Sequence, residues 1–158
     1  MTLYHGTYMD FAEIDIAKSQ KFKDFGQGFY LTDLRIQAER MAERKARLFD
    51  GTPMVQEYVF DEQLLKDEIL NVKVFEHPNV EWARFIERNR NREMSPFNHG
   101  FDIVIGPVAD DGVAYLMGRY HEGTLSIEQL AKELEYKQLN NQYLFATVKA
   151  IGFLERII

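Results

Sequence analysis

Apolar residues occur along the chain in two patterns, which predict different elements of secondary structure. Short apolar runs predict strands at residues 2–5, 28–32, 54–60, 69–75, 101–108 and 142–147. Apolar residues three or four positions apart predict a helix over 33–49, with Thr32 or Asp33 as its N-cap. The two kinds of element do not alternate regularly, so the pattern favours an α+β fold over a doubly wound parallel sheet.

Three more helices are predicted, two of them from capping residues that precede apolar faces. Asn79 is a suitable cap for a helix whose apolar side begins at Trp82. Another helix is predicted over residues 111–120. Ser126 and Gln129 form a capping-box pair at the start of a third helix.

Composition narrows the class of protein. Hydrophobic residues make up 46% and aromatic residues 13% of the 158 positions, which is enough for a packed core without disulfides or metal. Because no linker or repeat divides the chain, one domain is predicted over residues 1–158. The sequence has no cysteine, no apolar run of about 20 residues and no basic–apolar leader, so we expect cytoplasmic residence and no membrane association.

The formal net charge of −6 argues against a broad nucleic-acid-binding surface, because phosphate binding needs clustered Lys and Arg. Two local basic patches, Lys18–Lys23 and Arg35–Arg47, fit either solvated surface or a local binding site. Asn89, Arg90 and Arg92 exceed what the surrounding helix needs, and arginine is well suited to bind a phosphate. A limited contact with nucleic acid therefore stays open.

His5 is the first candidate for chemistry. It ends a predicted strand and precedes Gly6 and Thr7, which place backbone and a hydroxyl beside the imidazole. A hydrogen-bonded structural histidine is the alternative. The four histidines match no helix-borne ligand spacing, so no metal site is predicted. Without cysteine or a GxSxG motif, no Cys or Ser nucleophile is expected.

The stretch KFKDFGQGFYLT, residues 21–32, raises a separate question. Gly26 and Gly28 flank one polar residue, and aromatic residues such as Phe29 and Tyr30 stand next to them. Glycines allow a tight turn into a core strand, but they also let backbone approach a flat ligand while Tyr30 offers a face for stacking. The residues alone leave both interpretations open.

Together with His5, this stretch resembles part of a known enzyme superfamily. LYHGT followed by GQGFYLT is similar to the NAD-binding strands of ADP-ribosyltransferases, in their diphtheria-toxin and poly(ADP-ribose) polymerase-like branch. The chain as a whole resembles an uncharacterised bacterial and phage domain family with the motifs DFGxGFYLT, EWxxFIxxNR and DIVIGPVADD. These motifs stand here as DFGQGFYLT (24–32), EWARFIERNR (81–90) and DIVIGPVADD (102–111). The resemblance implies ADP-ribosyltransferase-like split antiparallel β-sheets with flanking helices.

The same resemblance implies NAD as the substrate, with no metal. His5 would bind a ribose hydroxyl, the Gly6 backbone would bind the nicotinamide carboxamide, and Tyr30 would stack on the nicotinamide ring. The implied NAD-binding residues are His5, Gly6, Thr7, Gly28, Phe29 and Tyr30. Nicotinamide leaves as a neutral molecule through an oxocarbenium-like state, so the reaction depends on positioning and electrostatics more than on a strong nucleophile.

By this resemblance the protein is expected to be a mono-ADP-ribosyltransferase that modifies a macromolecule, either a protein or a nucleic acid. Compact bacterial members of such families often act as toxins, so an antitoxin protein is an expected partner. The implied catalytic residues are His5, Tyr30 and Gln142, and the position of Asp110 directly after the strand-like DIVIGPV adds it as a further catalytic candidate.

One position departs from the superfamily's pattern. The late strand normally begins with a glutamate that binds the ribose and activates the acceptor, whereas the equivalent residue here is Gln142. An amide binds a hydroxyl but cannot act as a general base, or it can simply satisfy the end of a strand. Asp110 is a candidate for the missing carboxylate, with a helix cap as its alternative role.

Two other functions stay open, and the first follows from this departure. If Gln142 marks a lost catalytic carboxylate, the protein is a catalytically weak or inactive module that binds NAD, ADP-ribose or a partner protein. RNA 2′-phosphotransferase-like chemistry is the third alternative, but that group uses two histidines and an arginine, of which only His5 fits here.

Overall fold

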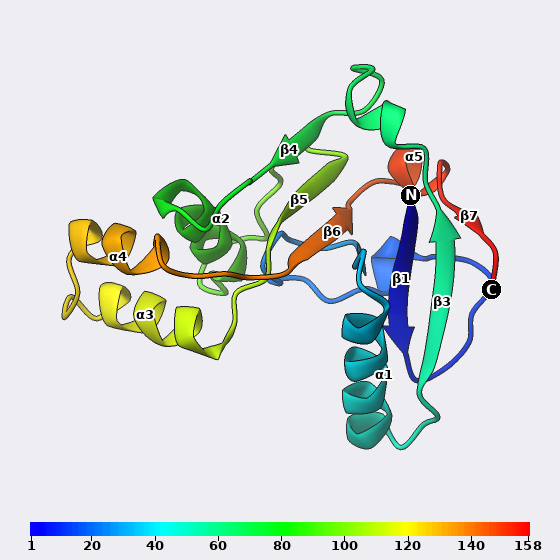
Figure 1. Ribbon diagram of the computed structural model, residues 1–158, viewed down its shortest axis with the longest axis horizontal. Helices are drawn as coiled ribbons and strands as arrows, with labels where there is room; N and C mark the ends of the chain where they lie inside the picture. Colours follow the sequence, from blue (N-terminus) through cyan, green and yellow to red (C-terminus); the bar gives the residue numbers. More distant parts are fainter.

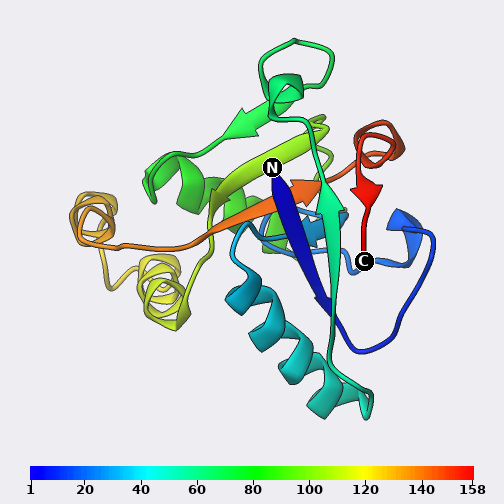
Figure 2. The same ribbon diagram turned by 45° about the vertical axis from the view of Figure 1, so that its right-hand side comes forward.

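The computed structural model describes residues 1–158 and contains two β-sheets (Figures 1 and 2). The three-stranded sheet has the order β1–β3–β7, formed by Thr2–Thr7, Met54–Val59 and Glu155–Arg156. The four-stranded sheet has the order β2–β6–β5–β4, formed by Phe29–Leu31, Asn141–Phe145, Ile103–Pro107 and Val72–Val74. The predicted strand at 69–75 is therefore shorter than expected.

The helices are α1 (Arg35–Phe49), α2 (Val80–Arg90), α3 (Asp111–His121), α4 (Ile127–Leu134) and α5 (Val148–Ile151), with the 3₁₀ turns η1 (Ile16–Lys18) and η2 (Glu62–Leu65). None of them combines the length and apolar character that crossing a bilayer requires. In Figure 1, α3 and α4 lie beside each other on the opposite side of the molecule from β1 and β3. The fold belongs to the α+β class, as the sequence predicts.

One strand pair departs from the predicted antiparallel sheets. β4 and β5 run parallel and pair Val72 with Ile103 and Val74 with Ile105. Helix α2 lies between these strands in the sequence, and a helical crossover of this kind returns the chain in the same direction. The prediction of antiparallel pairing is wrong for this pair, while the other strand pairs are antiparallel.

The four-stranded sheet is buried on both faces, and its strand residues alternate between two apolar clusters. Ile103 and Ile105 pack with Leu3 of the other sheet, in the cluster between the sheets. Val104 points the other way and packs with Trp82 in the cluster formed with α2, α3 and α4. This alternation follows from the two-residue period of a strand. It also explains why residues 101–108 form an almost continuous apolar run.

Helix α1 packs closely on β1, and one glycine makes this contact possible. A Cβ atom at Gly6 would lie 2.1 Å from the carbonyl oxygen of Ala38 and 2.8 Å from the amide nitrogen of Ala42. Because successive strand residues point to opposite faces, His5 and Thr7 face away from α1, toward the four-stranded sheet. The sequence of β1 therefore positions His5 between the two sheets.

The predicted caps are confirmed for three helices and wrong for α1. The side chains of Asn79, Asp110 and Ser126 accept hydrogen bonds at the starts of α2, α3 and α4. The N-cap of α1 is Leu34, which has no capping side chain. Thr32 instead accepts a hydrogen bond from the Leu34 amide through its hydroxyl, which forms a turn one residue before the helix.

Candidate functional site

The predicted site residues converge on a cavity of about 570 Å³ between the end of β1, the start of β2 and the segment that joins them. We call it the His5 cavity. Of the residues that the sequence implies for NAD binding, His5, Thr7, Gly28, Phe29 and Tyr30 line it. β1 and β2 meet through a bridge between Tyr4 and Thr32, so residues far apart in the sequence become neighbours here.

His5 is held as a neutral acceptor. Its Nδ1 lies 2.7 Å from the carbonyl oxygen of Tyr30, and its ring packs on Phe29 with centroids 4.3 Å apart. Burial, assisted by the nearby Lys45 cation, lowers the pKa of His5 to about 3. Because a carbonyl can only accept, Nδ1 carries the proton and donates it. The Nε2 atom is then free to accept a hydrogen bond from a ligand hydroxyl.

Tyr30 has a structural hydroxyl and an available ring. Its hydroxyl donates to the Gly26 carbonyl at 2.6 Å and accepts from the Phe25 amide at 3.0 Å. Burial raises the pKa of Tyr30 above its ordinary value. The ammonium group of Lys23 lies 5.2 Å from the ring centroid. The hydroxyl therefore fixes the turn, whereas the ring is the part that a ligand can contact.

The two glycines of the GQG stretch both have packing explanations. Gly26 has a φ of 93°, a value that favours glycine and allows the turn held by Tyr30. A Cβ atom at Gly28 would lie 2.5 Å from Cδ1 of Leu144 and 2.6 Å from the carbonyl oxygen of Phe145. The close approach at Gly28 is therefore to β6, so the turn and core strand account for both glycines without a ligand.

Gly6 and Thr7 are engaged by the protein itself. The Gly6 carbonyl accepts a hydrogen bond from Nζ of Lys45 at 2.9 Å, and Gly6 does not line the cavity. The Thr7 hydroxyl donates to the carbonyl oxygen of Met9 at 3.0 Å, and Thr7 is buried. Of the two, Thr7 borders the cavity, while Gly6 supports its wall through the contact with α1.

Three lysines line the cavity without a carboxylate partner. Lys18, Lys23 and Lys45 border it, and none of them belongs to the ion pairs of the structure. Burial, with the neighbouring Lys23, lowers the pKa of Lys45 to about 8. Burial also lowers the pKa of Lys23. Lys23 and Lys45 are thus partly desolvated cations without an ion-pair partner, which favours an anion beside them, while Asp10, Glu13 and Asp15 also line the cavity.

Sequence reasoning did not assign these lysines to the site. They come from the two basic patches, Lys18–Lys23 and Arg35–Arg47, for which solvated surface was one of two interpretations. The signal was present in the charge pattern. The charge pattern alone does not show that the two patches share a site, because Lys45 comes next to Lys23 only through the packing of α1 against β1.

The carboxylates of the cavity lie on the segment between β1 and β2. Asp10 accepts hydrogen bonds from Gln56 at 2.9 Å and from Arg156 at 2.6 Å. Asp15 caps η1 through the Ala17 amide. Glu13 is exposed and belongs to none of the ion pairs. Glu13 is therefore the carboxylate at this cavity that has no structural task.

The other two predicted catalytic residues lie elsewhere. Asp110 accepts a hydrogen bond from the Val113 amide at 2.8 Å and caps α3, which is the second of its two predicted roles. Gln142 pairs with Gly106 in the ladder between β5 and β6, and its Nε2 atom is buried without a partner. Neither residue lines the His5 cavity. The structure thus brings His5 and Tyr30 together but leaves Asp110 and Gln142 apart from them.

A metal site does not arise from these side chains. No three His, Asp or Glu residues gather closely enough to hold a metal ion.

The chain belongs to the family described as "Protein of unknown function (DUF3990)", whose model matches residues 1–155. This match confirms the predicted full-length relation to a family without an assigned activity. No curated protein and no solved structure matches the chain. The resemblance to ADP-ribosyltransferases therefore stays a prediction that depends on the residues of the His5 cavity.

Proposed function

We propose that this protein binds NAD in the His5 cavity and transfers its ADP-ribosyl group to a macromolecule. The observation that carries the proposal is the combination of a neutral His5, an aromatic face at Tyr30 and unpaired lysines in one cavity. Each matches one part of NAD: a ribose hydroxyl, a flat nicotinamide ring and a diphosphate. A volume of about 570 Å³ lies in the usual range for sites of small organic ligands.

The cationic nicotinamide ring suits the face of Tyr30. The ammonium group of Lys23 now lies over this ring as a cation–π contact. A pyridinium ring carries the same charge and adds a flat surface, so it can replace the ammonium there. Lys23 is then free to join Lys45 in neutralising the diphosphate.

In the reaction, the bond between ribose C1′ and the nicotinamide nitrogen breaks, and its electron pair leaves with nicotinamide. An acceptor nucleophile forms the new bond to C1′ and loses a proton. His5 would position the ribose through Nε2, and the surrounding dipoles would stabilise the developing positive charge. Glu13 is the free carboxylate that can take the acceptor's proton.

One observation favours a second candidate, a module that binds NAD or ADP-ribose without transfer. The neutral Gln142 lies outside the His5 cavity, and Glu13 is exposed instead of held in position. A general base must lie within hydrogen-bond reach of its proton. Nicotinamide release, and not nucleotide binding, distinguishes the two candidates.

The test is nicotinamide release from NAD by the purified protein, alone and with bacterial lysate, beside a titration of NAD binding. We expect His5→Gln to abolish release and Tyr30→Ala to weaken NAD binding, whereas Tyr30→Phe keeps the ring, loses only the hydrogen bonds of the turn and weakens binding less than Tyr30→Ala. His77→Gln, at an exposed histidine, is the matched control. Circular dichroism checks that each variant is folded.

The outcomes separate the candidates. Release that needs His5 supports the transferase, and labelled components of the lysate then identify the acceptor. Binding without release supports the binding module. Unchanged NAD turnover in both His5→Gln and Tyr30→Ala would contradict the assigned site.

A further inference from the structure

A second cavity, of about 270 Å³, lies on the other side of the loop that borders the His5 cavity. We call it the Asn89 cavity. The loop of residues 21–27, the end of α2 and the segment 96–101 contribute most of its lining. The proposed NAD chemistry does not use any of these walls. The cavity therefore needs its own explanation.

Asn89 lines this cavity and has an unused acceptor. Its side chain is 2% exposed, and its Nδ2 donates to the Phe85 carbonyl at 2.9 Å, which identifies the other atom as the oxygen. That oxygen, Oδ1, has no hydrogen-bond partner. This oxygen is buried against the backbone of Gly26, where a Cβ atom would lie only 3.1 Å from it. A buried acceptor without a donor is costly, and a ligand N–H group would satisfy it.

Aromatic rings form the walls of the cavity. His99 and Phe101 stack with centroids 5.4 Å apart, and Phe97 lies edge-on to His99. His99 uses both ring nitrogens, because Nε2 donates to the Phe25 carbonyl and Nδ1 accepts from the Phe101 amide. Burial lowers the pKa of His99, so its ring is neutral. His99 therefore contributes a neutral ring to the walls.

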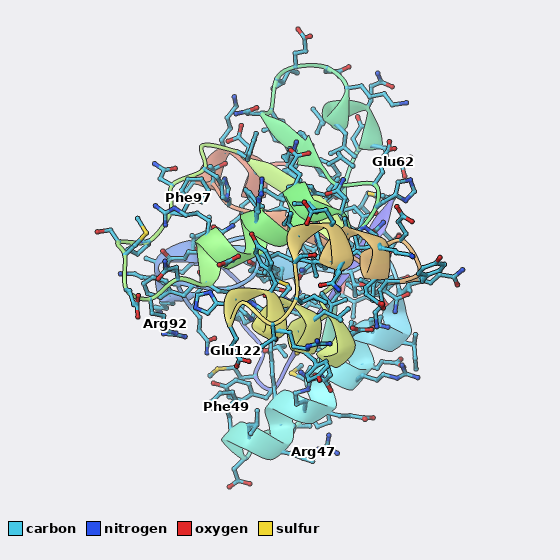
Figure 3. All side chains as sticks on the ribbon, turned by 90° about the vertical axis from the view of Figure 1, so that its left-hand side faces the viewer. Arg47, Phe49, Glu62, Arg92, Phe97 and Glu122 are labelled. Carbon is cyan, nitrogen blue, oxygen red and sulfur yellow. The ribbon has the colours of Figure 1, made fainter.

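Positive charge surrounds these rings. Arg88 lies 4.7 Å from the ring centroid of Phe97, and Arg92 lies 5.2 Å from that of Phe22. Lys21 is a lining residue, and the lining contains no Asp or Glu. None of these three cations belongs to an ion pair. Figure 3 shows Arg92 and Phe97 on the same side of the molecule, near the loop that follows α2.

Phe22 adds an independent sign of function. It is a bulky residue with a φ of 60°, a left-handed conformation that costs energy outside glycine. Strained residues of this kind concentrate at binding and catalytic sites. In this conformation the Phe22 ring lines the Asn89 cavity, with the guanidinium group of Arg92 over it.

We propose that the Asn89 cavity binds one base of a single-stranded nucleic acid. Every nucleobase has a flat face for Phe97 and Phe101 and an N–H donor for Asn89. The volume suits a base without its sugar and phosphate, so the backbone stays outside, beside Arg92 and Lys21. Aromatic stacking combined with Lys and Arg is the usual chemistry of single-strand binding.

The test is fluorescence anisotropy with short labelled oligonucleotides of DNA and RNA, measured over a range of salt concentrations. We expect Phe97→Ala to weaken binding about tenfold through lost stacking. Arg92→Ala should lower the slope of log K against log salt by about one. Asn89→Leu should weaken binding as well, and the two surface variants keep the test valid if it fails to fold. Arg47→Ala, at the far end of α1 in Figure 3, is the matched control.

The proposal has clear contrary outcomes. Absence of binding to both the DNA and the RNA oligonucleotides at low salt would overturn the proposal. Binding that Phe97→Ala and Arg92→Ala leave unchanged would overturn the assigned cavity. If a nucleoside monophosphate displaces the oligonucleotide and binds with the same affinity, the ligand is a free nucleotide and not a nucleic-acid strand. NAD binding, measured in parallel, should not change in these variants, so this result is independent of the proposed transferase activity.

Discussion

The His5 cavity and the Asn89 cavity border the same loop but are built in different ways. The walls of the His5 cavity include two strands and a helix that pack directly on each other, and they carry charges of both signs. The Asn89 cavity is built mainly from loops, and it combines aromatic rings with positive charge and no carboxylate. Each cavity also contains a neutral histidine, His5 in one and His99 in the other.

The difference teaches what each cavity is suited to do. In the His5 cavity, hydrogen bonds fix the tautomer of His5 and the position of Tyr30, so polar groups are oriented before a ligand arrives. In the Asn89 cavity, the oxygen of Asn89 has no partner. The first arrangement suits chemistry on a positioned substrate, and the second suits recognition of a flat group that brings its own donor.

The largest expected effect concerns the rigid wall behind His5. Gly6→Ala would place a methyl group 2.1 Å from the carbonyl oxygen of Ala38, so α1 must move away from β1. We expect a loss of more than about 3 kcal/mol in the free energy of unfolding, at or above the usual cost of overpacking. Urea unfolding of the purified variant measures it.

A glycine at the Asn89 cavity provides the matched comparison. Gly100 has a φ of 78°, and a Cβ atom there would meet nothing within 4 Å. Gly100→Ala should therefore cost only the backbone strain, about 1–2 kcal/mol. Equal losses in the two variants would mean that the wall behind His5 yields as easily as a loop, which would contradict the contrast between the cavities.

The second expected effect is a decrease in the stability of the folded protein as the pH falls. An unfolded chain protonates His5 near its ordinary pKa of 6.5, whereas in the folded protein burial holds the pKa at about 3. Between these values the unfolded state binds the extra proton, so the free energy of unfolding falls as pH decreases from 6.5 toward 3. The slope from this one group is on the order of 1.4 kcal/mol per pH unit.

His5→Asn tests this dependence, because its amide can still donate to the Tyr30 carbonyl but cannot titrate. The difference in stability between wild type and variant should shrink steadily from pH 7 to pH 4, as measured by urea unfolding. The exposed His77→Asn should follow the wild type. A constant difference for His5→Asn across this range would show that the buried imidazole gains a proton without cost. The assignment of His5 as a neutral hydrogen-bond acceptor would then be wrong.

The sequence predicts which strand residues line the His5 cavity better than it predicts which charged residues lie there. The sequence pairs LYHGT with GQGFYLT as the ends of neighbouring strands, and the structure does bring His5 next to Tyr30. The position of Lys45 depends on how α1 packs against β1, which no local pattern contains. The resemblance points to Gln142 in place of the late glutamate, and the position after DIVIGPV points to Asp110, but Gln142 lies in the β5–β6 ladder, Asp110 caps α3, and neither lines the cavity.

The Asn89 cavity was only partly visible in the sequence. In the sequence, Asn89 and Arg92 exceed what the surrounding helix requires. Their neighbours Phe22 and Phe97 stand far apart in the sequence and line the same cavity from two loops. The spacing of apolar residues predicts helices and strands, but it does not predict where loops meet. The parallel pairing of β4 and β5 was missed for a similar reason, because the direction of a short strand depends on its crossover and not on its own residues.

The smallest expected effect is a loss of ligand affinity at alkaline pH in the His5 cavity but not in the Asn89 cavity. Lys45 loses its charge as pH rises through its pKa of about 8, so the affinity of the His5 cavity for ADP-ribose should decrease above that value. From pH 7 to pH 9 we expect a loss of about tenfold, since one lost proton changes affinity by at most tenfold per pH unit. Isothermal titration calorimetry at several pH values measures it.

Lys45→Arg should remove this dependence, because a guanidinium group keeps its charge throughout the range. Oligonucleotide binding at the Asn89 cavity should change little between pH 7 and pH 9, since Arg88 and Arg92 supply most of the cations near its rings. If ADP-ribose affinity in the wild type is flat from pH 7 to pH 9, Lys45 does not hold the diphosphate. If both ligands weaken together and Lys45→Arg restores both, the two cavities act as one site, and the contrast between them is wrong.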